Sequence, residues 1–364
     1  MNLKLSEITE REIAPTLITG GAGFIGTNLA ARLLADSRPV VILDNLSRAG
    51  AERNLRWLQY QYGERLHVEI KDIRNFEAVW KAVQSAGQVF HLAAQVAVTT
   101  SLQAPVDDFE INARGTLNIL EALRLMDNPP PLVFTSSNKV YGDLGDIRLE
   151  QSALRYEPAG LTAPYEGIDE TCQLNFDSPY GCSKGAADQY VLGYAQSYGI
   201  PALVFRMSCI YGPHQFGTED QGWIAHFLIR ALDNEPITLF GDGRQVRDVL
   251  YVTDLIDALL AAQRNIAQLS GQAFNIGGGT ANTLSLLELG EHIAELEGHR
   301  PELKFDDWRN GDQKYFASNI ARFCTATGWM PKVSVYDGVA ALAAWLHTAR
   351  NPTESQAERS AAAG

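Results

Sequence analysis

TLITGGAGFIGTNLAARLLA, residues 16–35, is the stretch that decides the fold of this chain. It opens with a short apolar run typical of a buried strand, passes through a glycine-rich turn and continues as an amphipathic helix. The turn carries G-x-G-x-x-G at Gly21, Gly23 and Gly26, and G-x-x-G-x-x-G when counted from Gly20. Glycines in this pattern let backbone amides approach a pyrophosphate, and the helix N-terminus adds partial positive charge. The stretch therefore predicts dinucleotide binding, with Gly20, Gly23, Phe24 and Ile25 as cofactor-binding residues.

The next expected strand, PVVILDN, supports this interpretation because it ends in a carboxylate. Asp44 can accept hydrogen bonds from the ribose hydroxyls of adenosine and would repel a 2′-phosphate, which favours NAD over NADP. Asn45, Ser47 and Arg48 follow directly and are also expected beside the cofactor, although Arg48 leaves room for NADP. The alternative is a glycine turn that binds nothing, and the strand, turn, helix and strand-end aspartate together disfavour it.

Strand and helix patterns continue to alternate after this unit. LHVEIKD, QVFHLAA, PLVFTSS and ALVFRMS are typical of buried strands, and amphipathic stretches separate them. This alternation predicts an α/β fold with a Rossmann-type, doubly wound parallel sheet, whose ligands bind beyond the carboxyl ends of the strands. Asp72 could meet the adenine amino group there, or it could simply end its strand. The remaining cofactor-binding candidates are Asp72, Ile73, Leu92, Ala93, Ala94, Gln95, Asn112 and Met207.

Beyond Tyr211 the alternation loosens, which predicts a smaller C-terminal substrate domain. We expect the NAD-binding domain to span 14–206 plus about 244–276, and the nucleotide-sugar-binding domain to span about 207–243 plus 277–348. The insert Asp143–Phe176, rich in proline, glycine and acidic residues, predicts a long loop that forms a lid or a substrate wall. The small and polar residues 349–364 predict a disordered tail.

The composition excludes several classes of function. The chain has 364 residues and a net charge of −13, which argues against nucleic acid because a phosphate backbone requires a basic surface. No apolar run approaches the roughly 20 residues of a membrane-spanning helix, and the polar N-terminus lacks the apolar core of a signal peptide. The four cysteines have neither metal nor disulfide spacing, so we expect no metal and a reducing cytoplasm.

The chemistry is carried by YGCSK, which places Tyr180 and Lys184 four residues apart. Such a pair shares one helix face, and an ammonium beside a phenol favours the phenolate. This tyrosine can take a proton from a sugar hydroxyl while hydride passes to a nicotinamide. Alone, the pattern also describes an ordinary surface pair. With the glycine turn and Ser137 upstream, it predicts redox chemistry on an alcohol, whereas His91 is expected to be a core histidine.

The chain resembles the extended short-chain dehydrogenase/reductase family of nucleotide-sugar epimerases and dehydratases. The resemblance runs from about Thr16 to Trp345 and is carried by TGGAGFIG, DNLS, HLAA, NARGTLNILEA, SSNKVYG, SPYGCSKGAADQY, RMSCIYGP, GDGRQVRDVLYVTDL and RNGDQ. It implies NAD as cofactor and Ser137, Tyr180 and Lys184 as catalytic residues. Ser137 would hydrogen-bond the reacting oxygen, and Tyr180 would be the acid and base. Lys184 would hold the nicotinamide ribose and depress the tyrosine pKa.

Asn138 and Lys139 discriminate between the reactions of this family. Its 4,6-dehydratases carry Asp-Glu after the hydroxyl residue, and Asn-Lys cannot supply those acids, so epimerisation is favoured unless both residues simply serve the loop. Arg247 and Arg309 suit a diphosphate, because a guanidinium matches phosphate geometry. Arg206 could join them or form a structural ion pair. The resemblance implies these substrate-binding residues: Thr99, Asn138, Lys139, Ser208, Gln221, Phe240 (stacking near the base, or a core aromatic), Arg247, Arg309 and Asp312 (at a ribose hydroxyl).

The stretches DNLSRAGAERNLRWL, HLAAQVAVTTS and DQGW are similar to members of the family that act on CDP-sugars at C2. This similarity implies epimerisation at C2 of a CDP-3,6-dideoxyhexose or a related CDP-hexose by transient oxidation. A UDP-sugar 4-epimerase, a CDP-glucose 2-epimerase and a non-catalytic NAD-binding sensor are the alternatives. The family also implies a homodimer in which helices near 107–126 and 180–198 form a four-helix bundle. A packing face within the chain is the alternative there.

Overall fold

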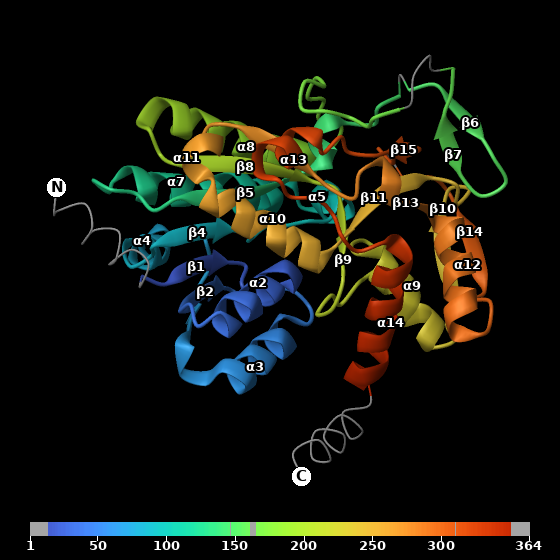
Figure 1. Cartoon of the computed structure of the whole chain (residues 1–364), viewed down its shortest axis with the longest axis horizontal. Helices are drawn as coiled ribbons and strands as arrows, with labels where there is room; N and C mark the ends of the chain where they lie inside the picture. The colour runs from blue at the N-terminus through green and yellow to red at the C-terminus, as the bar shows by residue number, and fades with distance from the viewer. Residues whose placement is uncertain (1–13, 146, 161–164, 310, 351–364) are drawn as a thin grey trace, which may run out of the picture.

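The computed structural model describes residues 14–145, 147–160, 165–309 and 311–350. A parallel seven-stranded sheet lies at its centre, in the order β3-β2-β1-β4-β5-β8-β12 (Figure 1). These strands are β1 (Thr16–Thr19), β2 (Val40–Asp44), β3 (Leu66–Ile70), β4 (Gln88–His91), β5 (Leu132–Ser137), β8 (Ala202–Met207) and β12 (Ala273–Ile276). The direction of winding reverses between β1 and β4, where sheets of this kind open a ligand crevice. The predicted doubly wound α/β fold is confirmed.

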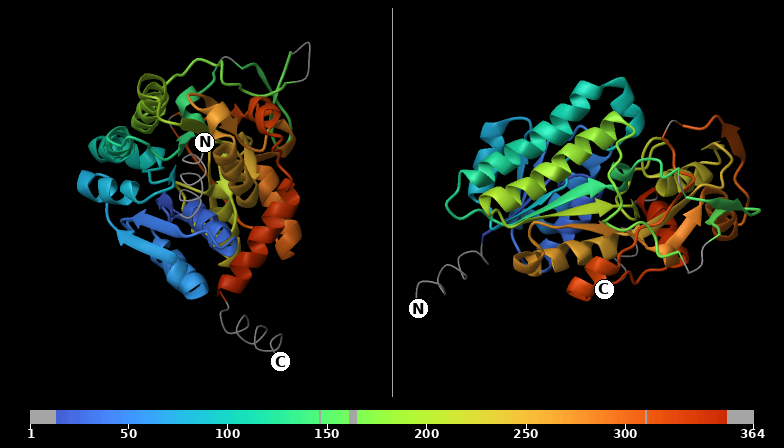
Figure 2. Two further views of the ribbon diagram at one scale, coloured as in Figure 1. Left: turned by 60° about the vertical axis from the view of Figure 1, so that its left-hand side comes forward. Right: turned by 90° about the horizontal axis from the view of Figure 1, so that it is seen from above.

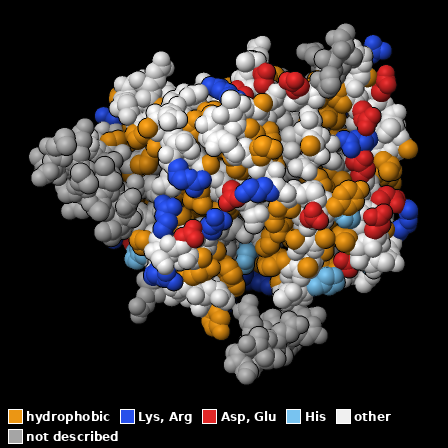
Figure 3. Space-filling model, in the orientation of Figure 1, with side chains coloured by type: hydrophobic (Ala, Val, Ile, Leu, Met, Phe, Trp, Pro, Cys, Tyr) orange, Lys and Arg blue, Asp and Glu red, His pale blue; other side chains and the backbone are white. Residues whose placement is uncertain are grey.

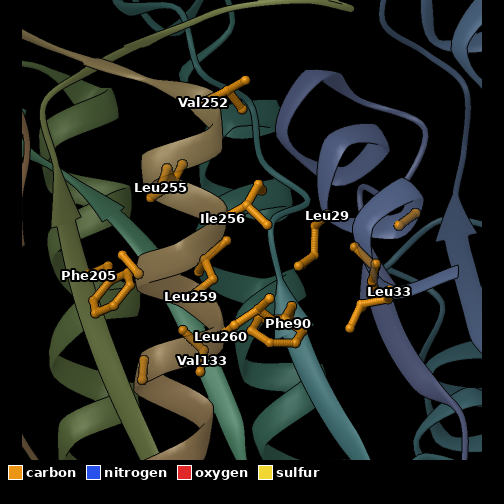
Figure 4. Packing of buried hydrophobic residues seen from close by; sticks show 14 of the residues in the cluster. Leu29, Leu33, Phe90, Val133, Phe205, Val252, Leu255, Ile256, Leu259 and Leu260 are labelled. Atoms are coloured by element: carbon orange, nitrogen blue, oxygen red, sulfur yellow. The ribbon is translucent and has the colours of Figure 1, made fainter. Parts of the chain in front are cut away.

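Each face of this sheet is buried under its own set of helices, because side chains alternate along a strand. In β1, Leu17 belongs to one core cluster and Ile18 to the other. On the Ile18 face, Leu29 and Leu259 pack toward Phe90, as Figure 4 shows. That face carries α2 (Phe24–Ala35), α3 (Ala51–Tyr62), α10 (Val252–Arg264) and α11 (Ile266–Leu269), whereas α4 (Phe76–Gln84), α7 (Gly115–Arg124) and α8 (Pro179–Tyr198) cover the opposite face (Figure 2). We call this sheet with its helices the large half.

A second core lies beyond the carboxyl ends of the strands and defines the small half. Its residues include Leu228, Val249, Leu289 and Leu342. The small half is built from β9 (Cys209–Tyr211), α9 (Trp223–Leu232), β10 (Ile237–Phe240), β11 (Val246–Tyr251), β13 (Thr283–Ser285), α12 (Leu286–Glu297), β14 (Leu303–Asp306), β15 (Tyr315–Phe316) and α14 (Val335–Arg350). Strand β11 pairs with β9, β13 and β15, and β10 pairs with β14. The short α13 (Ala321–Thr327) returns to the large half, where Phe323 joins the core.

The structure differs from the expected division of the chain at three places. Residues 244–251 were assigned to the first domain, but β11 lies in the small sheet, so the returning segment adds α10 and β12 instead. The insert 143–176 is not simply a long loop, because β6 (Leu149–Gln151) and β7 (Tyr156–Pro158) pair as a hairpin. This hairpin docks on the small half, where Arg155 Nη1 lies 3.2 Å from Glu288 Oε1. The expected disordered tail, 349–364, overlaps α14, which runs through Arg350; residues 351–364 lie outside the described part of the chain.

The surface agrees with the acidic composition. On the face seen in Figure 3, lysine and arginine side chains lie among acidic ones, and acidic side chains gather over the small half at the right. No helix in the described ranges has the length and apolar character needed to cross a bilayer.

Candidate active site

The glycine turn after β1 is packed so closely that side chains are excluded from it. A Cβ on Gly20, whose φ is +69°, would lie 2.7 Å from the backbone nitrogen of Ala93. A Cβ on Gly26 would lie 2.3 Å from the carbonyl oxygen of Gly20. The turn therefore brings bare backbone to the start of α2, where the first amides of a helix have no intrahelical partner. This arrangement fits the pyrophosphate of a dinucleotide.

Asp44 is held at the edge of this turn by backbone amides. Its Oδ2 accepts a hydrogen bond from Ala22 N at 3.0 Å, and its Oδ1 accepts one from Leu46 N at 2.8 Å. Burial raises the pKa of Asp44, and the amide hydrogen bonds oppose that rise. The carboxylate is thus pre-positioned at the end of β2, where it can meet the ribose of a dinucleotide.

Asp72 lies beside Asp44 but is already engaged. Its carboxylate accepts hydrogen bonds from Asn45 Nδ2 at 2.8 Å and from Arg74 Nη2 at 2.9 Å. The hydrogen bond from Arg74 is the main reason that the pKa of Asp72 is lowered to about 2. An adenine contact would therefore share this carboxylate with the arginine.

Ser137 and Tyr180 meet because a strand end faces a helix start. Ser137 is the last residue of β5, and its Oγ accepts a hydrogen bond from Lys139 N at 3.2 Å. Helix α8 begins at Pro179 after Ser178, whose Oγ caps it by accepting from Gly181 N at 3.1 Å. The Tyr180 amide donates to Ser101 Oγ at 3.1 Å. These local contacts fix the tyrosine at the carboxyl end of the sheet.

Tyr180 is buried, and its surroundings shift its pKa in both directions. Burial raises its pKa to about 12, whereas the hydrogen bond with Ser137 and the charge of Arg48 lower it. The ammonium of Lys184 donates to the carbonyl of Thr135 at 2.6 Å and lies 4.5 Å from the ring centroid of Phe134. Burial lowers the pKa of Lys184 itself to about 7. That Lys184 depresses the pKa of Tyr180 when the cofactor is bound stays a prediction.

A buried ion pair follows Lys184 along the same helix. Asp188, one turn further along α8, is fully buried and forms two hydrogen bonds with Arg206, at 2.9 and 3.0 Å. Asp188 also raises the pKa of Lys184 against the effect of burial. Of the two interpretations for Arg206, the structure therefore supports the ion pair rather than a diphosphate contact.

Asn112 ties the end of β4 to α8. It lies in a π-helical turn (Glu110–Arg114) between α6 (Pro105–Phe109) and α7, and such turns often occur at functional sites. Its Nδ2 donates to the carbonyl of Gln95 and to Ser183 Oγ, both at 3.0 Å, and its Oδ1 accepts from Gln95 N at 2.9 Å. This side chain holds the expected cofactor-binding segment 92–95 against the helix that carries Tyr180.

His91 is a core histidine, as expected. It is buried between Thr19 Oγ1 at 2.7 Å and Thr116 Oγ1 at 2.9 Å, and burial lowers its pKa to about 3. Among the described residues, no group of histidine, cysteine and acidic side chains could hold a metal ion.

Two of the expected substrate residues follow Ser137 directly in a short helical turn (Asn138–Tyr141). Asn138 Oδ1 lies 3.4 Å from Ser137 Oγ. Lys139 Nζ donates to the carbonyl of Gly311 in the small half at 3.3 Å. Burial and the nearby Arg247 lower the pKa of Lys139 to about 8. Lys139 and Ser178 also line a small cavity with Val98 and Gly311.

The two expected diphosphate arginines come from the small half, and each is paired with carboxylates. Arg247 on β11 lies 2.5 Å from Asp312 Oδ1. The guanidinium of Arg309 lies 3.8 Å from the ring centroid of Phe240, near the carboxylates of Glu219 and Asp220. The structure thus gathers four of the predicted substrate residues into two clusters.

Three other predictions differ in outcome. Thr99 Oγ1 is buried and has no hydrogen-bond partner among the described residues, and its substrate contact stays a prediction. Ser208 instead donates to the carbonyl of Asp248 at 2.9 Å, so its hydroxyl is used within the small sheet. Gln221 Oε1 accepts from Arg48 Nη2 at 2.9 Å, which joins a predicted cofactor residue to a predicted substrate residue.

Some supporting residues were missed by sequence reasoning. Ser101, Ser183 and Thr135 position the backbone or the ammonium of the Tyr180 helix. No sequence motif distinguishes these three residues, because serine and threonine occur throughout a chain whether or not their hydroxyls support a site. Asp108, on α6, also accepts hydrogen bonds from Asn112 Nδ2 and Gln95 Nε2.

A Rossmann-type sheet with a glycine turn, a strand-end aspartate and a Ser–Tyr–Lys set defines the short-chain dehydrogenase/reductase class of NAD-binding enzymes. The model of the NAD dependent epimerase/dehydratase family matches residues 16–277. The chain belongs to this family.

Relatives of known name agree with this assignment. The chain is 44% identical over 345 residues to a CDP-paratose 2-epimerase of Salmonella typhi, covering 90% of this chain and 98% of the relative. It is 32% identical to a UDP-glucose 4-epimerase of Mycolicibacterium smegmatis, covering 89% and 96%. The structure of a Thermus thermophilus UDP-glucose 4-epimerase in complex with NAD has a TM-score of 0.76 at 32% identity, covering 92% and 99%. The chain is an NAD-dependent nucleotide-sugar epimerase.

Proposed function

We propose that the chain inverts C2 of a CDP-3,6-dideoxyhexose, or of a related CDP-hexose, by transient oxidation to a keto-sugar. The observation that carries this proposal is the Ser137–Tyr180 pair beside the glycine turn, followed by Asn138 and Lys139 rather than by acids. The 44% identity to a CDP-paratose 2-epimerase supports the choice of carbon and base.

Each catalytic residue has a distinct task in this proposal. Tyr180 takes the proton of the C2 hydroxyl, and Ser137 hydrogen-bonds the same oxygen. Lys184 keeps the tyrosine helix anchored to β5 and offers its remaining donors to the cofactor ribose. NAD supplies the hydride acceptor and donor when it is bound. After the keto-sugar has turned over, Tyr180 returns the proton and C2 has the opposite configuration.

The substrate tether comes from the small half. Arg247 and Arg309 hold the diphosphate, so that the sugar can rotate without leaving the site. Because Asn138 and Lys139 carry no carboxylate, the elimination of water lacks its acid and base. Thr99, whose hydroxyl has no partner in the part of the chain that the structure describes, contacts the sugar. The cofactor lies along the glycine turn, Asp44 and the segment 92–95.

The test is incubation with CDP-paratose, CDP-glucose and UDP-glucose, followed by NMR at C2 and C4. We expect CDP-paratose to be inverted at C2. A substrate deuterated at C2 should keep its label in ordinary water, because hydride is carried by the cofactor and does not exchange with solvent. Turnover of UDP-glucose alone, with inversion at C4, would replace this proposal by a UDP-sugar 4-epimerase. The 32% identity to such an enzyme makes that the second candidate.

We further propose a cytoplasmic homodimer built on a four-helix bundle. Helices α7 and α8 lie side by side on one face of the sheet (Figure 2), and the segment before α7 exposes Val106 and Phe109. Tyr190 on α8 is also half-exposed. Apolar groups at such a face are typical of an interface with a second copy. Light scattering coupled to gel filtration should give the dimer mass for the wild type, and Val106→Glu with Phe109→Glu should give the monomer.

A further inference from the structure

The ring of Phe240 is already covered by a flat, hydrogen-donating group. The guanidinium of Arg309 lies 3.8 Å from the ring centroid, and its Nη1 donates to the carbonyl of Glu219 at 3.2 Å. Its Nη2 lies 3.6 Å from Glu219 Oε1 and 3.5 Å from Asp220 Oδ1. A planar group on an aromatic ring, with N–H groups directed at oxygens, imitates a stacked base that carries an amino group.

The acceptors are presented by a tight turn. Thr218 N donates to the carbonyl of Gln221 at 2.9 Å, and Gln221 N donates back to Thr218 at 3.1 Å. These bonds leave Glu219 and Asp220 at the tip of the turn. Arg48 of the large half donates a hydrogen bond to Gln221. The backbone that carries both acids is therefore held in a turn without the help of Arg309.

Arg309 can be displaced from this position at low cost. About 28% of its side chain is exposed, as are 50% of Glu219 and 47% of Asp220, and exposed pairs of this kind contribute little stability. An aromatic ring also stacks well on a nucleobase. Arg309 then becomes available to a diphosphate, whose geometry suits a guanidinium.

We propose that Glu219 and Asp220 read the nucleobase and select cytosine over uracil, with Phe240 as the stacking platform. Cytosine carries an amino group at C4, which donates to carboxylates and to the Glu219 carbonyl. Uracil carries an oxygen there, which would face these acceptors without a hydrogen and with electrostatic repulsion. Discrimination thus arises as much from rejecting uracil as from binding cytosine. This inference rests on the proposed function, because it names the feature that would make the substrate a CDP-sugar.

The test compares CDP and UDP binding by calorimetry in the NAD-loaded wild type and in Glu219→Gln/Asp220→Asn. We expect the wild type to bind CDP at least about tenfold more tightly than UDP. In the double variant CDP should weaken, UDP should be unchanged or tighter, and the ratio should fall to about threefold or less. A diphosphate of pyrimidin-2-one riboside, which has no group at C4, should bind with intermediate affinity to the wild type.

Two controls separate base reading from other effects. Glu291→Gln/Glu302→Gln removes two exposed charges elsewhere on the small half, and the CDP-to-UDP ratio should not change. Phe240→Leu should weaken CDP and UDP equally, because stacking does not distinguish the bases. The thermal midpoint of each variant checks that it is folded.

Each remaining outcome overturns a stated part. Equal tightening of CDP and UDP in the double variant would mean that the acids only restrain Arg309, and an unchanged ratio would mean that they do not read the base. A wild type without preference for CDP would instead overturn the CDP assignment in the proposed function. Inversion at C2 is measured in the separate NMR experiment, so these binding results do not decide it.

Discussion

The two halves of the molecule hold their polar groups in different ways. In the large half, Ser137, Tyr180 and Lys184 are at most 9% exposed, and their partners are backbone groups and neighbouring hydroxyls. In the small half, Arg247 and Arg309 are paired with carboxylates on loops. Internal hydrogen bonds keep one geometry, whereas an arginine–carboxylate pair can exchange its carboxylate for a phosphate. The large half therefore keeps its polar groups in one arrangement, and the small half can exchange partners when a ligand binds.

The largest expected effect is the loss of activity in Tyr180→Phe, a change in the large half. Loss of the acid and base should lower kcat by about 10²- to 10⁴-fold, with little change in the affinity for nucleotide-sugar or in bound NAD. Tyr190→Phe, on the exposed side of the same helix, is the matched control and should retain wild-type activity. Near-normal turnover by Tyr180→Phe would remove the tyrosine from its assigned role.

The second effect concerns the buried cation of the large half. Lys184 has a pKa of about 7 when folded, against about 10.5 when unfolded, so the unfolded chain binds more protons between these values. Wild-type stability should therefore rise with pH across that window relative to Lys184→Met, by up to a few kcal/mol. Urea unfolding of the nucleotide-free proteins at several pH values measures the difference. A stability difference that is constant with pH would contradict this.

A smaller effect separates two glycines. Gly26→Ala places its Cβ 2.3 Å from the Gly20 carbonyl, so the turn must move, the fold should lose about 1–3 kcal/mol and the affinity for NAD should drop. Gly290→Ala on α12 meets nothing closer than 3.8 Å and should be neutral or stabilising by up to about 1 kcal/mol. Thermal unfolding and NAD titration measure both variants. Equal behaviour of the two variants would show that the turn does not need bare backbone.

The mildest expected change lies in the small half. Arg247→Lys keeps the charge but loses the two-pronged geometry, so KM for the nucleotide-sugar should rise about tenfold while kcat changes little. Arg300→Lys, in a surface pair with Glu291, is the control and should have no effect. A fall in NAD occupancy without a change in KM would move Arg247 from the substrate to the cofactor.

The sequence was most informative where function resides in a local pattern. The turn at Gly20–Gly26, Asp44 and the Tyr180–Lys184 spacing each lie within one strand–helix connection, and parallel strands bring such connections to one edge. It was least informative where a side chain had to choose a partner. Lys184 donates to the carbonyl of Thr135, and Ser208 donates to the carbonyl of Asp248. The pairing of β11 with the small sheet was missed for the same reason, since register depends on neighbours distant in sequence.

By itself, the sequence determined the doubly wound sheet, the glycine turn and the Tyr180–Lys184 spacing, because each depends on residue type at short spacing. Only the tertiary structure decided that burial raises the pKa of Tyr180, that Arg206 is consumed by Asp188, and that Glu219 and Asp220 meet Arg309 above Phe240. Those outcomes depend on desolvation and on contacts between residues as far apart as 219 and 309. Such contacts exist only after the chain has folded, because folding alone sets the distances and the solvent exposure of the groups involved.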